Sequence, residues 1–235
     1  MYIVKEIKNH GSTKVSIIRD KGNFYIKKEL TIDKYPFREL FNQEIKITKS
    51  LNHKNIISIK EVQDNYFTME YGDLGDLKEL LKTKTDRVIS KREYYLSRIL
   101  EGIQYMHTRN VIHNDLKLSN IFITKNDKVK IGDFGLSCIE GSKFFEKLPS
   151  YIFKGTFSLN KKDNNQTSNK EGDIYSLGVM LFELYTLKNP AFNNLDPNLI
   201  ENKKNQELFM DMISESPPTI TQIIKRFKDG KKNIF

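Results

Sequence analysis

Two short apolar runs near the middle of the chain, joined by a turn and flanked by polar loops, constrain the fold most. Residues 121–124 and 128–131 are β-prone, and Lys-Asn-Asp at 125–127 is a strong turn sequence. The loop at 111–120 reads Val-Ile-His-Asn-Asp-Leu-Lys-Leu-Ser-Asn, and residues 130–135 read Lys-Ile-Gly-Asp-Phe-Gly. A hairpin at this place would carry both loops to one end of a rigid platform.

The two loops contain side chains suited to one chemistry. Asp115 could act as a general base, Lys117 could contact an anion, and Asn120 and Asp133 supply the hard oxygen ligands that Mg²⁺ prefers. A tight turn at Asp-Phe-Gly and a helix-to-strand link at His-Asn-Asp are the plain structural alternatives. They do not explain why both motifs occur in this order, so the pattern favours a phosphoryl-transfer site.

The loops resemble the catalytic and metal loops of protein kinases. The resemblance implies an α+β bilobal fold, with an N-lobe of a five-stranded antiparallel sheet plus one helix, a mainly helical C-lobe, and the cofactors ATP and Mg²⁺. It assigns Asp115 to the substrate hydroxyl proton, Lys117 to the transferred phosphate, and Asn120 and Asp133 to the metal. The residues that would support these loops are His113, Phe134, Gly135 and Thr156.

The N-terminal part is predicted to hold three antiparallel strands, at 2–7, 13–20 and 23–29, separated by turn sequences. A helix beginning at Pro36 follows, and it places Glu44 on its inward stripe, where a carboxylate needs a partner. In kinases this partner is a lysine of the third strand. Lys27 and Lys28 are both available, and because side chains alternate across a strand only one can point inward. The fit of Phe-Tyr-Ile-Lys to the family motif favours Lys27.

Strands at 56–62 and 66–70 complete the predicted sheet, and residues 71–76, with two glycines, form the connector between lobes. The chain is therefore expected to be a single kinase domain over 1–235, with an N-lobe at 1–70, a hinge at 71–76 and a C-lobe at 77–235.

The resemblance also implies an ATP site along this connector. Met69 would lie behind the adenine, and the backbones of Glu70 and Gly72 would bind its edge. Asp76 fits ribose binding and the capping of a helix with Glu79 equally well.

The C-terminal part is predicted to be helical. Tyr95, Ile99, Ile103 and Met106 share one face of a helix over 91–108, and the apolar run at 174–185 predicts a helix buried at the centre of a lobe. Asp173, before that run, resembles the kinase aspartate that holds the catalytic loop. Two further helices are predicted, over 204–214 and 219–228, separated by a Pro-Pro pair.

The sequence departs from the kinase pattern around the reaction centre. Of the glycine-rich nucleotide loop only Gly11 and Val15 remain, which predicts weaker nucleotide handling. Asn114 replaces the arginine that usually grips a phosphorylated activation segment, so control by phosphorylation of that segment is not expected. Ala-Pro-Glu is absent, with residues 161–163 in its place, and Pro217 replaces its usual arginine partner, so both members of that ion pair are lost together.

Composition bounds the remaining choices. The net charge of +9 comes from scattered lysines, which favours a solvated surface over a nucleic-acid site, although the basic tail at 225–235 could bind one. One cysteine, Cys138, excludes an intrachain disulfide, and no run is long enough to span a bilayer. An intracellular, cytoplasmic protein without a membrane partner is expected, and a nuclear location stays open.

The sequence thus predicts an ATP- and Mg²⁺-dependent protein kinase. Asp-Leu-Lys-x-x-Asn and Gly-Thr at 155–156 are similar to Ser/Thr kinases, so the expected partners are a protein substrate with a Ser or Thr acceptor and a regulatory protein. The alternative is a pseudokinase or decoy scaffold that binds nucleotide or a kinase partner without turnover. The sequences at residues 119–136 and 172–179 also resemble those of the stress kinases that phosphorylate a translation initiation factor.

Overall fold

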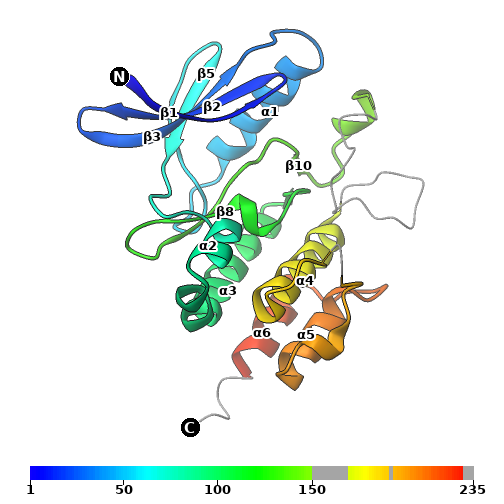
Figure 1. Ribbon diagram of the computed structural model, residues 1–235. Coiled ribbons are helices and arrows are strands. Elements are labelled where there is room, and N and C mark those ends of the chain that lie inside the picture. Colours follow the sequence, from blue (N-terminus) through cyan, green and yellow to red (C-terminus); the bar gives the residue numbers. More distant parts are fainter. Residues whose placement is uncertain (150–168, 191–192, 230–235) are drawn as a thin grey trace.

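The computed structural model describes residues 1–149, 169–190 and 193–229, apart from the side chains of residues 8–10. A sheet with one helix against it forms the N-terminal part, and a group of helices forms the C-terminal part (Figure 1). This arrangement confirms the predicted α+β class.

The N-terminal sheet has five antiparallel strands in the order β1-β2-β3-β5-β4. Their bounds are β1 Tyr2–His10, β2 Thr13–Asp20, β3 Asn23–Leu30, β4 Ile59–Val62 and β5 Tyr66–Glu70. Consecutive strands pair wherever a short turn joins them. The one pairing between strands that do not follow each other is β3 with β5, because α1 (Phe37–Ser50) separates β3 from β4 along the chain and β4 lies at the edge of the sheet.

α1 begins after Pro36 and buries one side, formed by Phe41, Glu44, Ile47 and Thr48. Phe41 packs in a small cluster with Leu30 and Phe67 of the sheet, whereas Ile47 belongs to the large core of the C-terminal part. The helix therefore contacts both hydrophobic cores, and Glu44 lies on the helix between the two anchor points.

Five helices of the described chain form the C-terminal part. They are α2 Leu77–Thr83, α3 Thr85–His107, α4 Lys170–Thr186, α5 Lys203–Met212 and α6 Ile220–Asp229. The predicted helices are confirmed, but α3 starts six residues earlier than expected and α4 four residues earlier. The early start of α4 has a local cause, because the side chain of Asn169 accepts a hydrogen bond from the Gly172 backbone.

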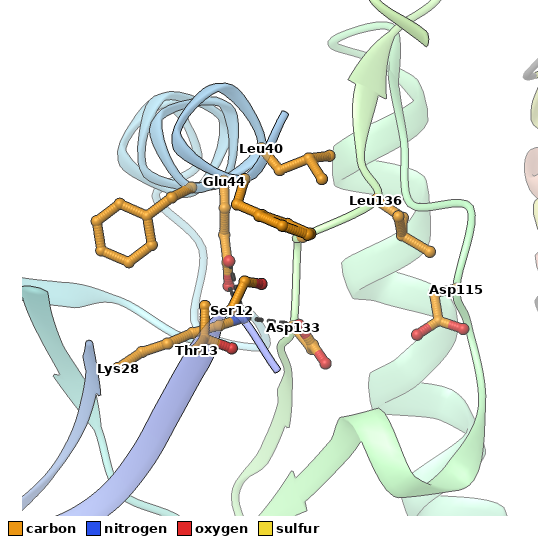
Figure 2. A pocket seen from close by; sticks show the side chains of 11 residues that line it. Ser12, Thr13, Lys28, Leu40, Glu44, Asp115, Asp133 and Leu136 are labelled. Atoms are coloured by element: carbon orange, nitrogen blue, oxygen red, sulfur yellow. Dashed lines mark hydrogen bonds and ion pairs between the residues drawn. The ribbon is translucent and has the colours of Figure 1, made fainter. Parts of the chain in front are cut away.

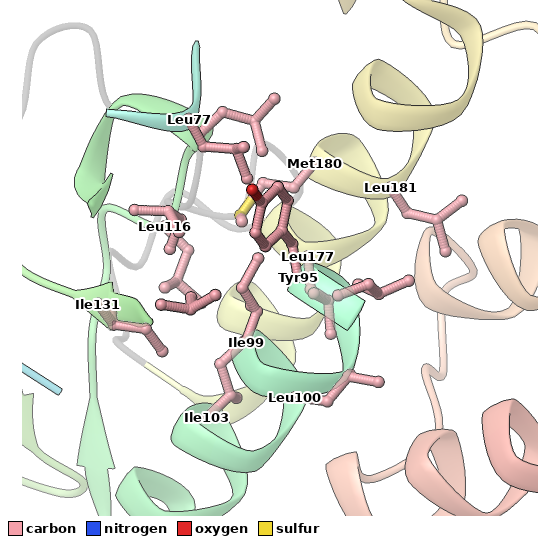
Figure 3. Close-up of a cluster of buried hydrophobic side chains, with 14 of the residues drawn as sticks. Leu77, Tyr95, Ile99, Leu100, Ile103, Leu116, Ile131, Leu177, Met180 and Leu181 are labelled. Carbon is pink, nitrogen blue, oxygen red and sulfur yellow. The ribbon is translucent and has the colours of Figure 1, made fainter. Parts of the chain in front are cut away.

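The large core lies between α3, α4 and the middle hairpin. Figure 3 shows Tyr95, Ile99 and Ile103 of α3 beside Leu177 and Met180 of α4, all of them at most 1% exposed. α4 is apolar on nearly every side, which predicted that it would be buried, and the structure encloses it between neighbouring elements.

The predicted hairpin is present as β8 Ile121–Ile123 and β9 Val129–Ile131, with β6 Gly75–Asp76 beside β8. A second small pair, β7 Val111–Ile112 with β10 Cys138–Ile139, was not predicted. Short 3-10 turns occur at η1 Leu118–Asn120, η2 Phe145–Lys147 and η5 Pro197–Leu199. Because β7 precedes the catalytic loop and β10 follows the metal loop, the two pairings hold the loops side by side.

Among the described residues, no helix is both long and apolar enough to cross a bilayer.

Candidate active site

The loop after β7 is held from below by one buried carboxylate. Asp173, at the start of α4, is fully buried and accepts hydrogen bonds from the backbone nitrogens of His113 and Asn114, each at 2.9 Å. His107 of α3 lies 2.9 Å from the same carboxylate. The predicted position of Asp173 beneath the catalytic loop is confirmed.

His113 links the catalytic loop to the metal loop. Its Nδ1 faces the backbone nitrogen of Asp115 at 3.3 Å, and its Nε2 lies 3.1 Å from the carbonyl oxygen of Gly132. Since Nδ1 accepts from an N–H, the proton of a neutral ring is assigned to Nε2, which donates to Gly132. The fully buried ring also packs against Phe134. His113 and Phe134 thus support the loops, as expected.

Asp115, Lys117 and Asn120 come together at the end of the hairpin. Lys117 Nζ lies 2.9 and 2.7 Å from the two carboxylate oxygens of Asp115. The amide nitrogen of Asn120 donates to the Asp115 carboxylate at 2.9 Å and to its backbone carbonyl at 2.8 Å. These contacts leave Oδ1 as the atom of Asn120 that can ligate a cation.

A lysine, a glutamate and an aspartate from three elements form the second half of the site. Lys28 Nζ of β3 lies 2.8 Å from the carboxylate of Glu44 on α1 and 3.2 Å from Oδ1 of Asp133, and Figure 2 shows the three side chains converging. The prediction that Lys27 is the partner of Glu44 is wrong. Lys27 instead pairs with Glu29 at 3.0 Å and lies over the ring of Tyr66.

Strand alternation explains this correction. Side chains of adjacent strand residues point to opposite faces, and Lys28 is the one on the face of β3 that meets α1. The motif fits the frame ending at Lys27 better, but it does not show which face of β3 meets α1, so it favoured the wrong lysine. Lys27 contacts Glu29 and Tyr66 on the outward face of the sheet, and these two residues were the signal that could have identified Lys28 as the inward lysine.

The charges of this group affect one another. The ammonium of Lys28 lowers the pKa of Asp133 to about 2, against a smaller opposing effect of burial. Burial alone would lower the pKa of Lys28, but Asp133 and Glu44 outweigh it, so the net pKa lies above its ordinary value. The pKa of Glu44 is raised by burial, and Lys28 opposes that shift only in part.

The two halves of the site face one cavity of about 240 Å³. Lys28, Glu44, Asp115 and Asp133 all line it, with apolar side chains of α1 and Leu136 around them (Figure 2). The Asp133 side chain is 44% exposed despite its ion pair, so the carboxylate is accessible to a cation. Carboxylate and amide oxygens beside a lysine fit a Mg²⁺–phosphate group. Among the described residues, however, no cluster of three His, Cys, Asp or Glu side chains forms a metal cage.

The remnant of the glycine loop is a tight turn between β1 and β2. Gly11 has φ +51°, the left-handed conformation that favours glycine, and nothing lies within 4 Å of the position of a Cβ. The turn is tied to the segment before α1, because the Thr31 backbone nitrogen donates to Ser12 O at 2.8 Å and its hydroxyl to Gly11 O at 3.0 Å. Val15 pairs with Lys28 across β2 and β3.

The connector residues have structural contacts that do not depend on nucleotide. The half-buried Met69 packs against both cores. The Glu70 carboxylate pairs with Lys130 of β9 at 2.8 Å and accepts from Ser58 N at 2.9 Å. At Gly72 a Cβ would lie 2.9 Å from Cβ of Phe122, so only glycine fits there.

Three further site predictions have different outcomes. Asp76 accepts a hydrogen bond from Glu79 N at 2.9 Å and caps α2, which confirms the capping interpretation and leaves ribose binding a prediction. At Gly135 a Cβ would make only ordinary contacts, at 3.5 Å from Glu44 and Asp133. Thr156 lies outside the described residues, as do residues 161–163.

Comparison with known proteins agrees with this geometry. Residues 9–233 match the family described as protein kinase domain. The cell cycle serine/threonine-protein kinase CDC5/MSD2 of Saccharomyces cerevisiae is 34% identical over 193 residues, which cover 77% of this chain and 27% of that protein. The probable serine/threonine-protein kinase PLK of Dictyostelium discoideum is 30% identical, covering 83% of this chain and 22% of that protein.

The serine/threonine-protein kinase Nek5 of Homo sapiens is also 30% identical, covering 85% of this chain and 32% of that protein. The chain thus spans less than a third of each of these three relatives. Residues 9–233, which match the family, include the two loops, the Lys28–Glu44 pair and the helical core. On this match and this geometry, the chain belongs to the eukaryotic-type Ser/Thr protein kinase superfamily.

Proposed function

We propose that this protein is an active, ATP- and Mg²⁺-dependent kinase that transfers the γ-phosphate to Ser or Thr hydroxyls of protein substrates. One observation carries the proposal: Lys28, already paired with Glu44 and Asp133, shares a cavity with Asp115. A scaffold without turnover does not require this arrangement.

Each residue has a separate task in the proposed reaction. When bound, the nucleotide and metal supply the phosphoryl group and most of the charge neutralisation. Asp115 accepts or orients the proton of the acceptor hydroxyl, and Asn120 holds the Asp115 carboxylate in place. Lys28 is a fixed positive charge for phosphate oxygens, positioned by Glu44. Lys117, which is half exposed, can turn from Asp115 to the transferred phosphate.

The proposal includes the mode of control and the setting. Asn114 supplies no positive charge, which supports a kinase that is not controlled by phosphorylation of its activation segment, with control left to a partner protein.

The Asp-Leu-Lys motif around Lys117 supports a Ser/Thr acceptor. A single, buried cysteine, Cys138, supports an intracellular and cytoplasmic location. The likeness to translation-factor kinases stays a prediction.

The direct test is transfer of radiolabelled phosphate from Mg·ATP to a basic protein substrate. Wild type and the matched control Asn52→Ala, which removes an exposed side chain, should incorporate label equally. Asp115→Asn should lower kcat by about 10²–10⁴-fold, because the general base is lost while the fold is kept. Equal incorporation by Asp115→Asn and wild type would refute the proposal.

The scaffold alternative has one observation in its favour, the reduction of the glycine loop to a turn with Gly11 alone. Thermal shift with Mg·ATP separates the two functions. Nucleotide at 100 times its Kd should stabilise an ATP-binding kinase by about 2.7 kcal/mol. A stable complex with a partner kinase, no thermal shift and no transfer would favour the scaffold.

A further inference from the structure

Asn114 occupies a constrained position between the two loops of the site. Its backbone has φ +64°, in the left-handed region that asparagine tolerates better than most residues. Asp173 holds its backbone nitrogen, and only 5% of the residue is exposed. A side chain in such a place needs partners for its amide.

The amide of Asn114 binds the segment that follows the metal loop. Its Nδ2 donates to the backbone carbonyl of Leu136 at 2.8 Å and lies 3.6 Å from Sγ of Cys138. Leu136 is three residues after Asp133, so this bond fixes the backbone immediately after the metal ligand.

A second buried side chain makes the reciprocal contact. The hydroxyl of Ser137 donates to the carbonyl oxygen of His113 at 3.0 Å, and Ser137 has no exposed surface. Each loop therefore offers one side chain to the backbone of the other. The pairing of Ile112 with Cys138 between β7 and β10 extends this connection on one side.

We propose that Asn114 and Ser137 form an uncharged latch that keeps Asp133 in its metal-binding position without phosphorylation of the activation segment. The two are positioning residues, because neither lines the cavity that holds Asp115 and Asp133. This inference rests on the proposed kinase function and names the residues that replace phosphate-dependent ordering.

Physical chemistry supports a permanent latch. A phosphate-gripping arginine orders its segment only when the anion is present, because a buried cation without a partner is costly. A buried amide and hydroxyl bound to carbonyl oxygens are satisfied without any added group. The latch is thus closed in the unmodified chain.

The experiment compares Asn114→Gly, Asn114→Asp and Ser137→Ala with the control Asn52→Ala. Glycine tolerates the left-handed backbone and removes only the amide, whereas the aspartate keeps the shape but cannot donate. Kinase assays give kcat, KM for ATP and the half-saturating Mg²⁺ concentration. Hydrogen exchange of the amides at 136–139 reports the latch itself, without any need for activity.

If the latch exists, Asn114→Gly and Asn114→Asp should lower kcat about tenfold and speed hydrogen exchange of the amides at 136–139 about tenfold. The half-saturating Mg²⁺ concentration should rise, whereas KM for ATP should stay within about twofold of wild type. Phosphatase treatment should leave wild-type kcat unchanged. The latch would be overturned if Asn114→Gly had the same exchange rates and kcat as wild type. It would also be overturned if phosphatase treatment abolished the activity of the wild-type protein. If wild type transfers no phosphate, the proposed function fails, and exchange alone then decides whether the latch exists.

Discussion

At the scale of single residues, two adjacent lysines show how contacts decide function. Lys27 and Lys28 are almost equally covered, with side chains 15% and 13% exposed. Burial therefore does not distinguish them. Lys28 meets two carboxylates in the cavity, whereas Lys27 lies on the opposite face with Glu29 and Tyr66.

Replacing Lys28 should therefore have a far larger effect than replacing Lys27. We expect Lys28→Met to lower kcat by about 10²-fold or more, since a preorganised charge is removed from the site. Lys28→Arg keeps a cation beside the buried Glu44 and serves as the variant that retains the fold. Lys27→Met is the matched control and should keep activity within about twofold. A larger loss in Lys27→Met than in Lys28→Met would contradict the assignment.

The same lysine should control the ionisation of Asp133. Lys28 holds the pKa of Asp133 at about 2, so this carboxylate stays ionised down to pH 4 in wild type, and the stabilisation it contributes is lost only as pH falls through 2. In Lys28→Met, the largest cause of the lowered pKa is gone and burial is opposed only by the weaker effects of His113 and Lys117, so the pKa of Asp133 rises. Carbon-13 NMR of the aspartate carboxyl should stay flat from pH 7 to 4 in wild type and titrate in the variant. Identical curves would show that Lys28 is not the cause.

At the scale of elements, the turn of the β8–β9 hairpin is tied to α3. Asp127, with φ +57°, accepts hydrogen bonds from Arg87, Lys91 and Tyr95 of that helix. Partial burial would raise the pKa of Asp127, but these three donors outweigh it and lower the pKa to about 2. This connection fixes the far end of the hairpin that carries the catalytic and metal loops.

Breaking this connection should change stability in acid. The contribution of Asp127 is complete above its unfolded pKa of about 3.9 and is lost as pH falls through about 2. Because Arg87 and Lys91 are 36% and 39% exposed, we expect only about 1 kcal/mol. Asp127→Asn should lose that amount in urea unfolding at pH 6 and approach wild type at about pH 1.5, below the folded pKa of Asp127. Asp86→Asn, at an exposed position of α3, should follow wild type at both pH values.

At the scale of the whole molecule, two cores of unequal size meet at the site. The sheet and α1 together form the cluster of Leu30, Phe41 and Phe67, whereas the C-terminal core extends from α3 and α4 to Ile56 and Ile57 in the link before β4. Met69 packs against both. Lys28 thus lies on a strand that supports the smaller core, Glu44 lies on the helix that contacts both cores, and Asp115 is next to Leu116 of the larger core.

Unequal cores predict unequal local stability. Amides of β2 and β3 should exchange through openings of lower free energy than amides of α3 and α4, because fewer apolar side chains support the sheet. Native-state hydrogen exchange read by mass spectrometry measures this, and Mg·ATP should protect β2 and β3 selectively. Equal exchange in the sheet and in α3 would contradict the description of two cores.

Much of the fold could be predicted because its signals are local. Alternation and turn sequences located the sheet and the hairpin, and the apolar run at 174–185 located α4, since each depends on residues close in the chain. The start of α3 was missed because only Val88 and Ile89 are apolar between Thr85 and Lys91, too few to show a helical period, although Asp127 stabilises this turn from outside. β7 and β10 were missed because two-residue strands have no periodicity.

The chemistry near the hairpin follows from the order of residues along the chain, because Asp115, Lys117, Asn120 and Asp133 lie within one short stretch that local geometry brings together. The choice between Lys27 and Lys28 required the three-dimensional fold, because it depends on which face of β3 meets α1. The fold also decided what Asn114 does. In the sequence, Asn114 only indicates that the usual arginine is missing. In the fold, its amide binds the backbone of Leu136, 22 residues away, and joins the two loops. Contacts between distant segments depend on packing, which no local pattern encodes.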